Sequence, residues 1–392
     1  MIQNFAKEVK RKAYAEMIDL QKCREEIDRI DDQILRLFEE RMKVAEAVAE
    51  YKIKTGKKVL DPERERAKIK VLREKSDGEF NALGAQELFQ QIMAISRKRQ
   101  YQLLTKHGIE DEEQLQMVDE LPLKDVTVVF QGVEGAYSYA AMREYFDDDI
   151  RSYHVKTWKD AMEEVSGGRA DYAVLPIENS TAGIVAGIYD LLTEYNLNIV
   201  GEQIIRVEHV LLGLPEASIE DISHVYSHAQ GLAQCGKFLE SYPNWKCREV
   251  ENTAGAAKRV REENNPAHAA IASRQAGELY SLKVLAEDIC HNDQNATRFI
   301  IVSKKPVYVK DAKKISISFE LPHESGTLYN MLSHIIYNGL NMSKIESRPI
   351  PGKTWEYRFF VDFAGNLTDS AVKNALRGIE AEANCLQVLG NY

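Results

Sequence analysis

The stretch Asp171-Tyr-Ala-Val-Leu-Pro-Ile-Glu-Asn-Ser-Thr-Ala-Gly183 decides the architecture of the central part of the chain. Its first half is an apolar run of strand length, and its second half is a polar loop that can cap a following helix. Similar apolar runs recur at Val126–Phe130 and Asn198–Val200, separated by stretches of helical character. This alternation predicts an α/β domain with a largely parallel sheet over residues 125–304.

The polar loop of this stretch is a candidate ligand site. Open α/β sheets bind ligands beyond the carboxyl ends of their strands, and free N–H groups at a helix start favour a carboxylate. Asn179, Ser180 and Thr181 are also ordinary helix-capping residues, so the loop alone fits either interpretation.

Composition disfavours several classes of protein. The 392 residues suggest two or three domains, and a net charge of −10 argues against nonspecific nucleic-acid binding. Five cysteines without a CxxC pair disfavour a disulfide framework or a zinc site. The longest apolar runs are too short to span a membrane, and the charged N-terminus lacks an apolar signal region. We therefore expect a cytoplasmic protein without a metal ion.

Upstream, residues 17–107 follow a helical pattern. From Ile27 to Tyr51, seam positions recur by alternating threes and fours, which is a heptad seam. Asp61 and Pro62 fit an N-cap followed by proline at the first helical position. A third helix follows, so we expect an all-α domain over residues 1–108 and an acidic linker over residues 109–124.

Arg41 lies on the apolar seam where the pattern favours Ile or Leu. A buried guanidinium is costly without an anion, so it must meet a protein carboxylate or a ligand. On a straight helix Lys52 is rotated only roughly 20° from Arg41 and lies ~16 Å along the axis, whereas Arg24 is rotated by roughly 100° and would face a neighbour. The alternative is a solvated basic face with one salt-bridged arginine.

The C-terminal part follows the order strand, helix, strand, strand, helix, strand. The expected elements are Ile315–Leu321, Thr327–Asn338, Lys344–Pro349, Tyr357–Phe363, Asp369–Ala381 and a strand near Leu386. This βαββαβ order is typical of a small α+β ferredoxin-like module, which we assign to residues 305–392.

Residues 17–104 resemble the all-helical chorismate mutases. The resemblance rests on Arg24-Glu-Glu-Ile-Asp-Arg-Ile-Asp31, on Asp61-Pro-Glu-Arg-Glu65 and on the Ser96 and Gln100 pair. It implies an interlocked dimer in which the first arginine reaches the partner's pocket. The active-site positions that it implies are Arg24, Arg41, Lys52, Asp61, Arg64, Glu65, Ser96 and Gln100.

The implied reaction is the pericyclic conversion of chorismate to prephenate, which requires no proton transfer. The protein must hold a dicarboxylate in a folded conformer and stabilise negative charge on the ether oxygen. Arginines suit the carboxylates because their guanidinium is bidentate. The resemblance assigns Lys52 and Gln100 to the ether oxygen, and Asp61 and Glu65 to the hydroxyl side.

Residues 125–304 resemble the prephenate dehydratases. The motifs are Gly132-Val-Glu-Gly-Ala-Tyr-Ser138, Pro176-Ile-Glu-Asn179, Tyr226-Ser-His-Ala-Gln230 with the later Gln234, and Asn295-Ala-Thr-Arg-Phe299. The resemblance implies two α/β lobes, similar to periplasmic binding proteins, with the active site in the cleft. It also implies that no metal ion or organic cofactor is required.

In the implied dehydratase reaction, prephenate loses its ring hydroxyl and its ring carboxylate together and gives phenylpyruvate. Thr297 is the implied proton donor, and Arg298 is a candidate carboxylate anchor. The residues expected to orient the substrate are Asn179, Ser227 and Gln234. We interpret His209 and His228 as structural hydrogen-bonding residues.

Two C-terminal motifs resemble the ACT regulatory domain of these dehydratases. They are Glu324-Ser-Gly-Thr-Leu328 and Lys344-Ile-Glu-Ser-Arg-Pro349. The resemblance implies feedback inhibition by phenylalanine, bound by Gly326, Thr327, Leu328, Glu346, Ser347 and Arg348. Thr327 stands where alanine is usual, which adds a hydroxyl near the expected ligand.

Two other functions are alternatives to a bifunctional mutase and dehydratase. A fusion of the mutase to a prephenate dehydrogenase would need a GxGxxG loop, and Gly132-Val-Glu-Gly135 lacks that spacing. A non-catalytic phenylalanine-sensing binding protein is the remaining alternative, against which Lys52, Gln100 and Thr297 argue. We expect a homo-oligomer, dimer or tetramer, that binds chorismate, prephenate and phenylalanine and neither nucleic acid nor membrane.

Overall fold

The computed structural model describes residues 19–109, 114–147, 149–292, 294–324 and 326–392. They form two compact units, here called the helical unit (residues 1–111, 328–338 and 373–382) and the sheet unit (the remainder). Positions 17 and 18 of the expected first helix, and Ser325 of the C-terminal motif, lie outside the described residues.

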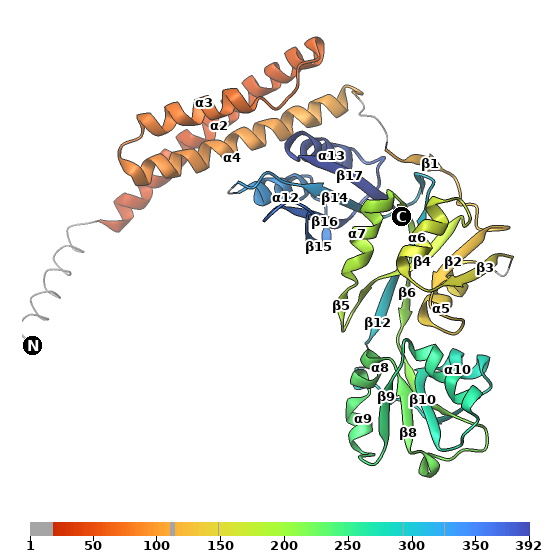
Figure 1. The fold of residues 1–392 in the computed structure, drawn as a ribbon. Helices are drawn as coiled ribbons and strands as arrows, with labels where there is room; N and C mark the ends of the chain where they lie inside the picture. Colours follow the sequence, from red (N-terminus) through yellow and green to blue (C-terminus); the bar gives the residue numbers. More distant parts are fainter. Residues whose placement is uncertain (1–18, 110–113, 148, 293, 325) are drawn as a thin grey trace, which may run out of the picture. The chain divides into compact units, whose positions relative to one another are not determined.

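Three helices dominate the helical unit, as the sequence predicts (Figure 1). They are α2 (Leu20–Thr55), α3 (Pro62–Lys75) and α4 (Gly78–Lys106). Asp61 caps α3, because its carboxylate accepts from the Arg64 N–H at 3.1 Å, and Pro62 opens the helix as expected. Both α2 and α3 pack along α4.

The heptad seam of α2 is exposed within this chain. Its apolar residues are each at least 36% exposed: Ile27, Ile30, Ile34, Leu37, Val44, Val48 and Tyr51. The residues of α2 that are buried within the unit are Ala45 and Ala49. A contiguous apolar stripe of this kind marks a protein–protein contact surface.

Two C-terminal helices, α12 (Thr327–Tyr337) and α13 (Ser370–Glu382), contribute most of their length to the helical unit. Lys98 on α4 donates to the Ser333 hydroxyl at 2.8 Å. Arg377 on α13 donates to the Ile109 carbonyl at 2.6 Å. These contacts fasten α4 to helices that lie more than 200 residues later in the chain.

The sheet unit contains a ten-stranded sheet with the order β15-β16-β14-β17-β6-β12-β4-β2-β3, and β5 pairs with β4 off this path. Its first half along the chain comprises β2 (Thr127–Gln131), β3 (Arg151–Val155), β4 (Tyr172–Asn179), β5 (Gly183–Ile184), β6 (Asn198–Arg206) and β12 (Ala296–Ser303). Helix α5 (Tyr137–Tyr145) packs on one face, and α6 (Trp158–Ser166) with α7 (Ala186–Tyr195) packs on the other.

A second, five-stranded sheet has the order β11-β7-β10-β8-β9 (Figure 1). The strands are β7 (His209–Gly213), β8 (His224–Ser227), β9 (Lys246–Glu249), β10 (His268–Ser273) and β11 (Lys283–Ala286). The helices around it are α8 (Ala229–Gln234), α9 (Gly236–Glu240), α10 (Thr253–Glu263) and α11 (Arg274–Leu279).

The expectation of a largely parallel sheet is wrong, because both sheets are mixed. β2 pairs parallel with β3 and β4, and β8 with β9 and β10. The strands β6, β7, β11 and β12 pair antiparallel. The reason is topological: the chain leaves one sheet after β6 and returns before β12, so these strands run in opposite directions.

The C-terminal strands have the antiparallel order β15-β16-β14-β17, which matches the predicted ferredoxin-like βαββαβ arrangement. They are β14 (Lys314–Glu320), β15 (Met342–Pro349), β16 (Tyr357–Ala364) and β17 (Cys385–Asn391). Strand β17 also pairs parallel with β6 at Gly390 and Ile199, so the two halves form one sheet. A Cβ atom on Gly390 would lie 2.1 Å from the Ile199 carbonyl oxygen, so this pairing requires glycine.

The predicted linker is more structured than expected. Its strand β1 (Gln116–Val118) pairs parallel with β13 (Val307–Val309), and Leu115 is buried. The Gln114 side-chain oxygen accepts from the Val388 N–H on β17 at 2.9 Å.

In the parts of the chain that are described, no helix is long and apolar enough to cross a membrane.

We expect Gly390→Ala to destabilise the folded protein by about 1–3 kcal/mol, because the added methyl group overpacks the β17–β6 contact. Urea titration of the variant and the wild type measures the loss. Gly236→Ala is the matched control, since a Cβ there meets nothing within 4 Å. Equal stability of the two variants would contradict a tight β17–β6 pairing.

Candidate active sites

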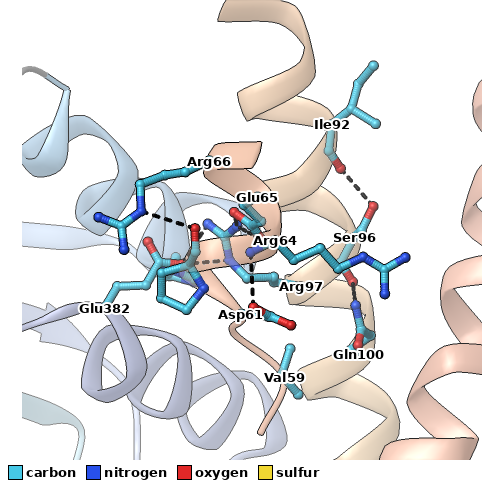
Figure 2. Close-up of polar contacts among 12 residues, drawn as sticks. Val59, Asp61, Arg64, Glu65, Arg66, Ile92, Ser96, Arg97, Gln100 and Glu382 are labelled. Carbon is cyan, nitrogen blue, oxygen red and sulfur yellow. Dashed lines mark hydrogen bonds and ion pairs between the residues drawn. The ribbon is translucent and has the colours of Figure 1, made fainter. Parts of the chain in front are cut away.

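One group of predicted residues gathers between α2, the start of α3 and α4. Figure 2 shows the members from the start of α3 and from α4. Arg41 donates to the Ser96 hydroxyl and, at 3.4 Å, to the Ile92 carbonyl. Gln100 lies one turn after Ser96 and donates to the Ser96 carbonyl at 3.2 Å. The Gln100 Oε1 atom is buried without a hydrogen-bond partner among the described residues. This oxygen is therefore free to accept a hydrogen bond.

Lys52 lies close to Glu65, as Arg41 does, and its Nζ donates to the Val59 carbonyl at 2.7 Å. Burial lowers the pKa of Lys52, whereas Asp61 and Glu65 raise it in opposition. Burial likewise lowers the pKa of Arg41, opposed by Glu65. Two cations with only partial compensation from carboxylates make the pocket suitable for an anion.

Arg24 does not reach this pocket in its own chain. It is exposed near the start of α2, 17 residues before Arg41. That separation is ~25 Å along a helix, which exceeds the reach of an arginine side chain.

Arg97 is a buried residue of this region whose role the sequence did not indicate. It is only 6% exposed, and its Nη1 donates to both Glu65 oxygens at 2.7 and 2.6 Å. Its Nε donates to Glu382 of α13 at 3.0 Å (Figure 2), and Glu382 also contacts His334 of α12 at 3.1 Å. Burial lowers the pKa of Arg97, but Glu382 and Glu65 outweigh it and raise that pKa overall. Glu65 is thereby held between the pocket and the C-terminal helices.

A second site is a cavity of about 290 Å³ in the sheet unit. Asn179, Thr297 and Phe299 from the large sheet contribute to its wall, and His209 and Gln234 come from the smaller sheet and its helix α8. The other lining residues are Gln131, Gly132, Ala136, Tyr137, Ser138, Trp158, Pro176, Val207, His228, Gln230, Gly231, Glu251, Asn252 and Thr253.

Thr297 and Asn179 are held together by sheet register, because they are partners in the β12–β4 ladder. The Asn179 amide donates to the Thr297 hydroxyl at 2.9 Å and to Asn295 Oδ1 at 2.9 Å. Since the Thr297 oxygen accepts from Asn179, its own proton is available for a molecule in the cavity.

The loop after Asn179 follows the capping interpretation of the sequence. Asn179 Oδ1 accepts from the N–H groups of Thr181 and Ala182 at 3.0 and 2.8 Å. These two N–H groups are therefore satisfied by the protein, and α7 begins only at Ala186. They do not form the carboxylate-binding helix start that the sequence also allowed.

His209 is buried behind Gln234. Its Nε2 lies 3.0 Å from Gln234 Oε1, and its Nδ1 lies 3.0 Å from the Tyr137 hydroxyl. Burial lowers the pKa of His209 to about 4, with the Gln234 contact in partial opposition. In the neutral ring, Nε2–H donates to Gln234 and Nδ1 is an acceptor. The Tyr137 hydroxyl lies between this acceptor and the Glu208 carbonyl, 3.0 Å from each. This arrangement fixes the Gln234 amide, and it agrees with the hydrogen-bonding role expected of His209.

Comparison with known proteins gives the family. The model of type II chorismate mutases matches residues 23–101, and the prephenate dehydratase model matches residues 128–307. The bifunctional chorismate mutase/prephenate dehydratase of Enterobacter agglomerans is 35% identical over 378 residues, with 94% of each chain covered. This chain belongs to the bifunctional chorismate mutase/prephenate dehydratase family.

Solved structures resemble the larger part of the chain. A prephenate dehydratase from Arthrobacter aurescens, in complex with L-Phe, has a TM-score of 0.63 at 33% identity, covering 68% of this chain and 89% of that one. A protein described as a quorum quenching acylase has a TM-score of 0.62 at 32% identity, covering 67% of this chain and 96% of that one.

Two predicted dehydratase residues do not reach the cavity. Ser227 is fully buried, and its hydroxyl donates to the Ile271 carbonyl at 2.7 Å. Arg298 forms ion pairs with Glu178, Glu202 and Asp362 at 3.6, 3.1 and 2.6 Å. Neighbouring strand residues point to opposite faces, so Arg298 faces away when Thr297 faces the cavity. In this structure the Arg298 guanidinium is occupied by protein carboxylates, and its role as a carboxylate anchor for the substrate stays a prediction.

Several residues that line this cavity were not predicted from the sequence. Glu251, Asn252 and Thr253 follow strand β9, and Asn252 caps α10 by accepting from the Gly255 N–H at 2.7 Å. A polar loop between a strand and a helix is the same signal that indicated Asn179. Trp158 carried no such signal, because it opens a helix.

The predicted regulatory residues have local partners. The Thr327 hydroxyl donates to the carbonyls of Pro322 and Glu324, at 3.2 and 3.0 Å. Arg348 forms a bidentate pair with Asp190 of α7, at 3.2 and 2.6 Å, whereas Ser347 is exposed. Gly326 has a φ of +84°, which favours glycine.

Among the described residues, no group of three or more His, Cys, Asp or Glu could hold a metal ion.

The lowered pKa of His209 makes stability depend on pH. In the unfolded chain His209 becomes protonated below about pH 6.5, whereas in the folded protein it becomes protonated only near pH 4. Between these values the unfolded state binds more protons, so the free energy of unfolding decreases as pH falls. Between pH 7 and pH 5 we expect a loss of about 2 kcal/mol from this residue. Urea titrations at both pH values measure it.

His209→Gln should remove this part of the pH dependence, because glutamine has no titrating group. His228→Gln is the control, since His228 is exposed and should leave the difference between pH 7 and pH 5 unchanged. A wild-type difference retained in His209→Gln would show that His209 is not buried in its neutral form.

Proposed function

We propose that each activity of the family resides in one of the two described sites. The pocket of the helical unit rearranges chorismate to prephenate, and the cavity at Thr297 converts prephenate to phenylpyruvate with loss of water and carbon dioxide. Two observations carry this proposal. Arg41 and Gln100 both bond to Ser96, and Arg41 and Lys52 both interact with Glu65. Asn179, Gln234 and Thr297 line one cavity in the sheet unit.

In the mutase pocket the protein binds and orients, and it forms no covalent bond to the substrate. Arg41 and a partner subunit's arginine would hold the two carboxylates, and Lys52 would stabilise negative charge on the ether oxygen. Gln100 can donate only through Nε2, which now donates to the Ser96 carbonyl. Its assignment to the ether oxygen therefore requires the amide to release that carbonyl. Arg64 and Asp61 lie at the start of α3, beside this pocket.

In the dehydratase cavity Thr297 would protonate the departing hydroxyl. A threonine is a weak acid, so aromatisation of the ring must supply most of the driving force. Asn179 holds the threonine oxygen, and neutral His209 holds Gln234, whose amide can then orient the substrate. The chain crosses from one sheet to the other after β6 and returns before β12, which favours two lobes that close over the substrate, as in periplasmic binding proteins.

A second copy of the chain would complete the mutase pocket. The apolar seam of α2 is exposed, and Arg24 lies on the same helix too far from its own pocket. Pairing of two α2 seams would bury the stripe and bring Arg24 to the other copy's site. This supports a homo-oligomer of at least two chains, either a dimer or a tetramer.

The C-terminal βαββαβ module is proposed to be an ACT domain that binds phenylalanine. The support is its strand order and the dehydratase that was solved in complex with L-Phe. Its sheet continues into the dehydratase sheet through β17, and Arg348 pairs with Asp190 of α7. Feedback requires phenylalanine to bind a low-activity arrangement better than the active one. The predicted cytoplasmic location stays a prediction.

Separate substitutions should separate the two activities. Lys52→Ala should lower mutase kcat/KM by about 10²–10³ and leave dehydratase turnover intact, because one donor to developing charge is lost. Thr297→Val should do the reverse, since it removes only a hydroxyl. A coupled assay from chorismate to phenylpyruvate, with each step also measured alone, gives both results.

The matched controls keep the chemistry in place. Lys54→Ala removes an exposed lysine from the same helix, and Thr297→Ser keeps the hydroxyl, so both should retain activity. Wild-type protein that binds phenylalanine but turns over neither substrate would favour the non-catalytic sensor instead.

Mixed dimers test the shared mutase site. Arg24→Ala and Lys52→Ala chains should each be weak alone and should regain activity after subunit exchange, because a mixed dimer contains one site with both residues intact. Mass spectrometry verifies the exchange, and each variant mixed with itself is the control. Verified exchange without any return of activity would refute the arginine donated across the interface.

Phenylalanine should inhibit the dehydratase, and Ser347→Trp should raise the inhibitory concentration by about tenfold or more, which corresponds to about 1.4 kcal/mol of lost affinity. Ser347 is exposed on β15, so the indole can fill the proposed ligand position without disturbing the core. Ser343→Trp, exposed on the same face of β15, is the control. Equal inhibition of both variants would place the sensor elsewhere.

A further inference from the structure

Two cysteines that are 55 residues apart in sequence meet beside the dehydratase cavity. Cys235 follows helix α8 and is fully buried, and Cys290 is half-buried in the segment before β12. Their Sγ atoms are 3.9 Å apart. The two thiols are therefore in contact, although neither lines the cavity.

The segments that carry the two thiols are linked, by the backbone and by hydrogen bonds, to residues that form the cavity wall. Cys235 directly follows Gln234, and the N–H after Cys290, that of His291, donates to the Gln234 carbonyl at 3.1 Å. Cys290 also accepts a hydrogen bond from the His209 backbone. The pair thus supports both partners of the His209–Gln234 hydrogen bond, which is 3.0 Å long.

We propose that Cys235 and Cys290 are a modification site, where hydrogen peroxide oxidises the two thiols to a reversible disulfide that lowers dehydratase turnover and leaves the mutase unchanged. The change in turnover rests on the proposed function of the cavity, whereas formation of the disulfide does not.

The positions of the two thiols give the order of the reaction. Hydrogen bonding from the Cys235 thiol lowers the pKa of Cys290, so the more exposed sulfur is also the one that ionises more easily. The Cys290 thiolate attacks one peroxide oxygen, which breaks the O–O bond and gives a sulfenic acid and, after protonation, water. The Cys235 sulfur then attacks the Cys290 sulfur and releases a second water. Two thiols are oxidised by two electrons in total, and one peroxide is reduced to two waters.

Closing the disulfide must strain the cavity wall. The sulfurs have to approach by roughly 1.9 Å to reach a disulfide bond length of about 2.05 Å. Cys235 is packed in a buried apolar cluster with Leu211, Ile271 and Ile289, so part of this shift passes to the neighbouring Gln234. A displacement of about 1 Å at a positioning residue can cost up to 10²-fold in rate, and we expect at least a tenfold loss.

The test treats the full-length reduced protein with hydrogen peroxide and then maps disulfides by peptide mass spectrometry. We expect a Cys235–Cys290 cross-link, at least a tenfold fall in dehydratase kcat/KM, unchanged mutase turnover, and full recovery with dithiothreitol. The chain's three exposed cysteines, Cys23, Cys247 and Cys385, are removed in a triple serine control. That control should respond like the wild type.

Cys290→Ser should keep dehydratase activity and resist the peroxide, and Cys235→Ala, with its folding verified by urea titration and circular dichroism, should do the same. Peroxide treatment without this cross-link, or a cross-linked protein with wild-type dehydratase turnover, would overturn the proposal. Reduced protein without dehydratase activity would instead overturn the proposed function, and disulfide mapping would still report on the thiol pair.

Discussion

The pairing of strand β12 with β4 and β6 is the constraint on which the dehydratase half of the molecule depends. The register places Thr297 opposite Asn179 on one side and opposite Ile205 on the other. Because the side chains of a strand alternate, the same register turns the next residue, Arg298, toward Asp362 of the C-terminal module. A slip of one residue would exchange the two faces and remove the hydroxyl from the cavity. One strand thus positions a proposed proton donor and an ion pair to the C-terminal module.

Periodicity and local chemistry predicted most of the elements. The seam from Ile27 to Tyr51 gave α2, the Asp61-Pro62 cap gave the start of α3, and the βαββαβ order gave the C-terminal strands. Pairing direction was not predictable in this way, because it depends on where the chain crosses between sheets. The strand in the linker was also missed, since three residues are too few to show a period, and β1 is stabilised by its partner β13.

For the site residues, too, the sequence predicted what depends on neighbouring residues and missed what depends on residues far along the chain. Asn179, Gln234 and Thr297 line the cavity because each motif places its residue at an end of a strand or helix: the end of β4, the end of α8 and the start of β12. Ser227 and Arg298 belong to the same motifs, but Ile271 and Asp362 occupy their polar groups, and neither partner can be inferred from nearby sequence. Arg97 is the clearest case, because its second carboxylate, Glu382, lies 285 residues later. A basic run after Ser96 is visible in the sequence, whereas its partners are not.

The ion pair of Arg97 also bears on how the two halves of the chain could influence each other. Glu65 sits at the mutase pocket, and the guanidinium that binds it is shared with Glu382, which in turn contacts His334. Removing one member of a buried charge network leaves the others unpaired, at a cost of about 3–5 kcal/mol, so the three groups act together. A shift of α13 would therefore change the charge that Glu65 presents to Arg41 and Lys52. Coupling of this kind does not need a contact between a ligand of the C-terminal module and the mutase substrate. It needs a helix with two alternative positions, and binding at either site must change the populations of those positions.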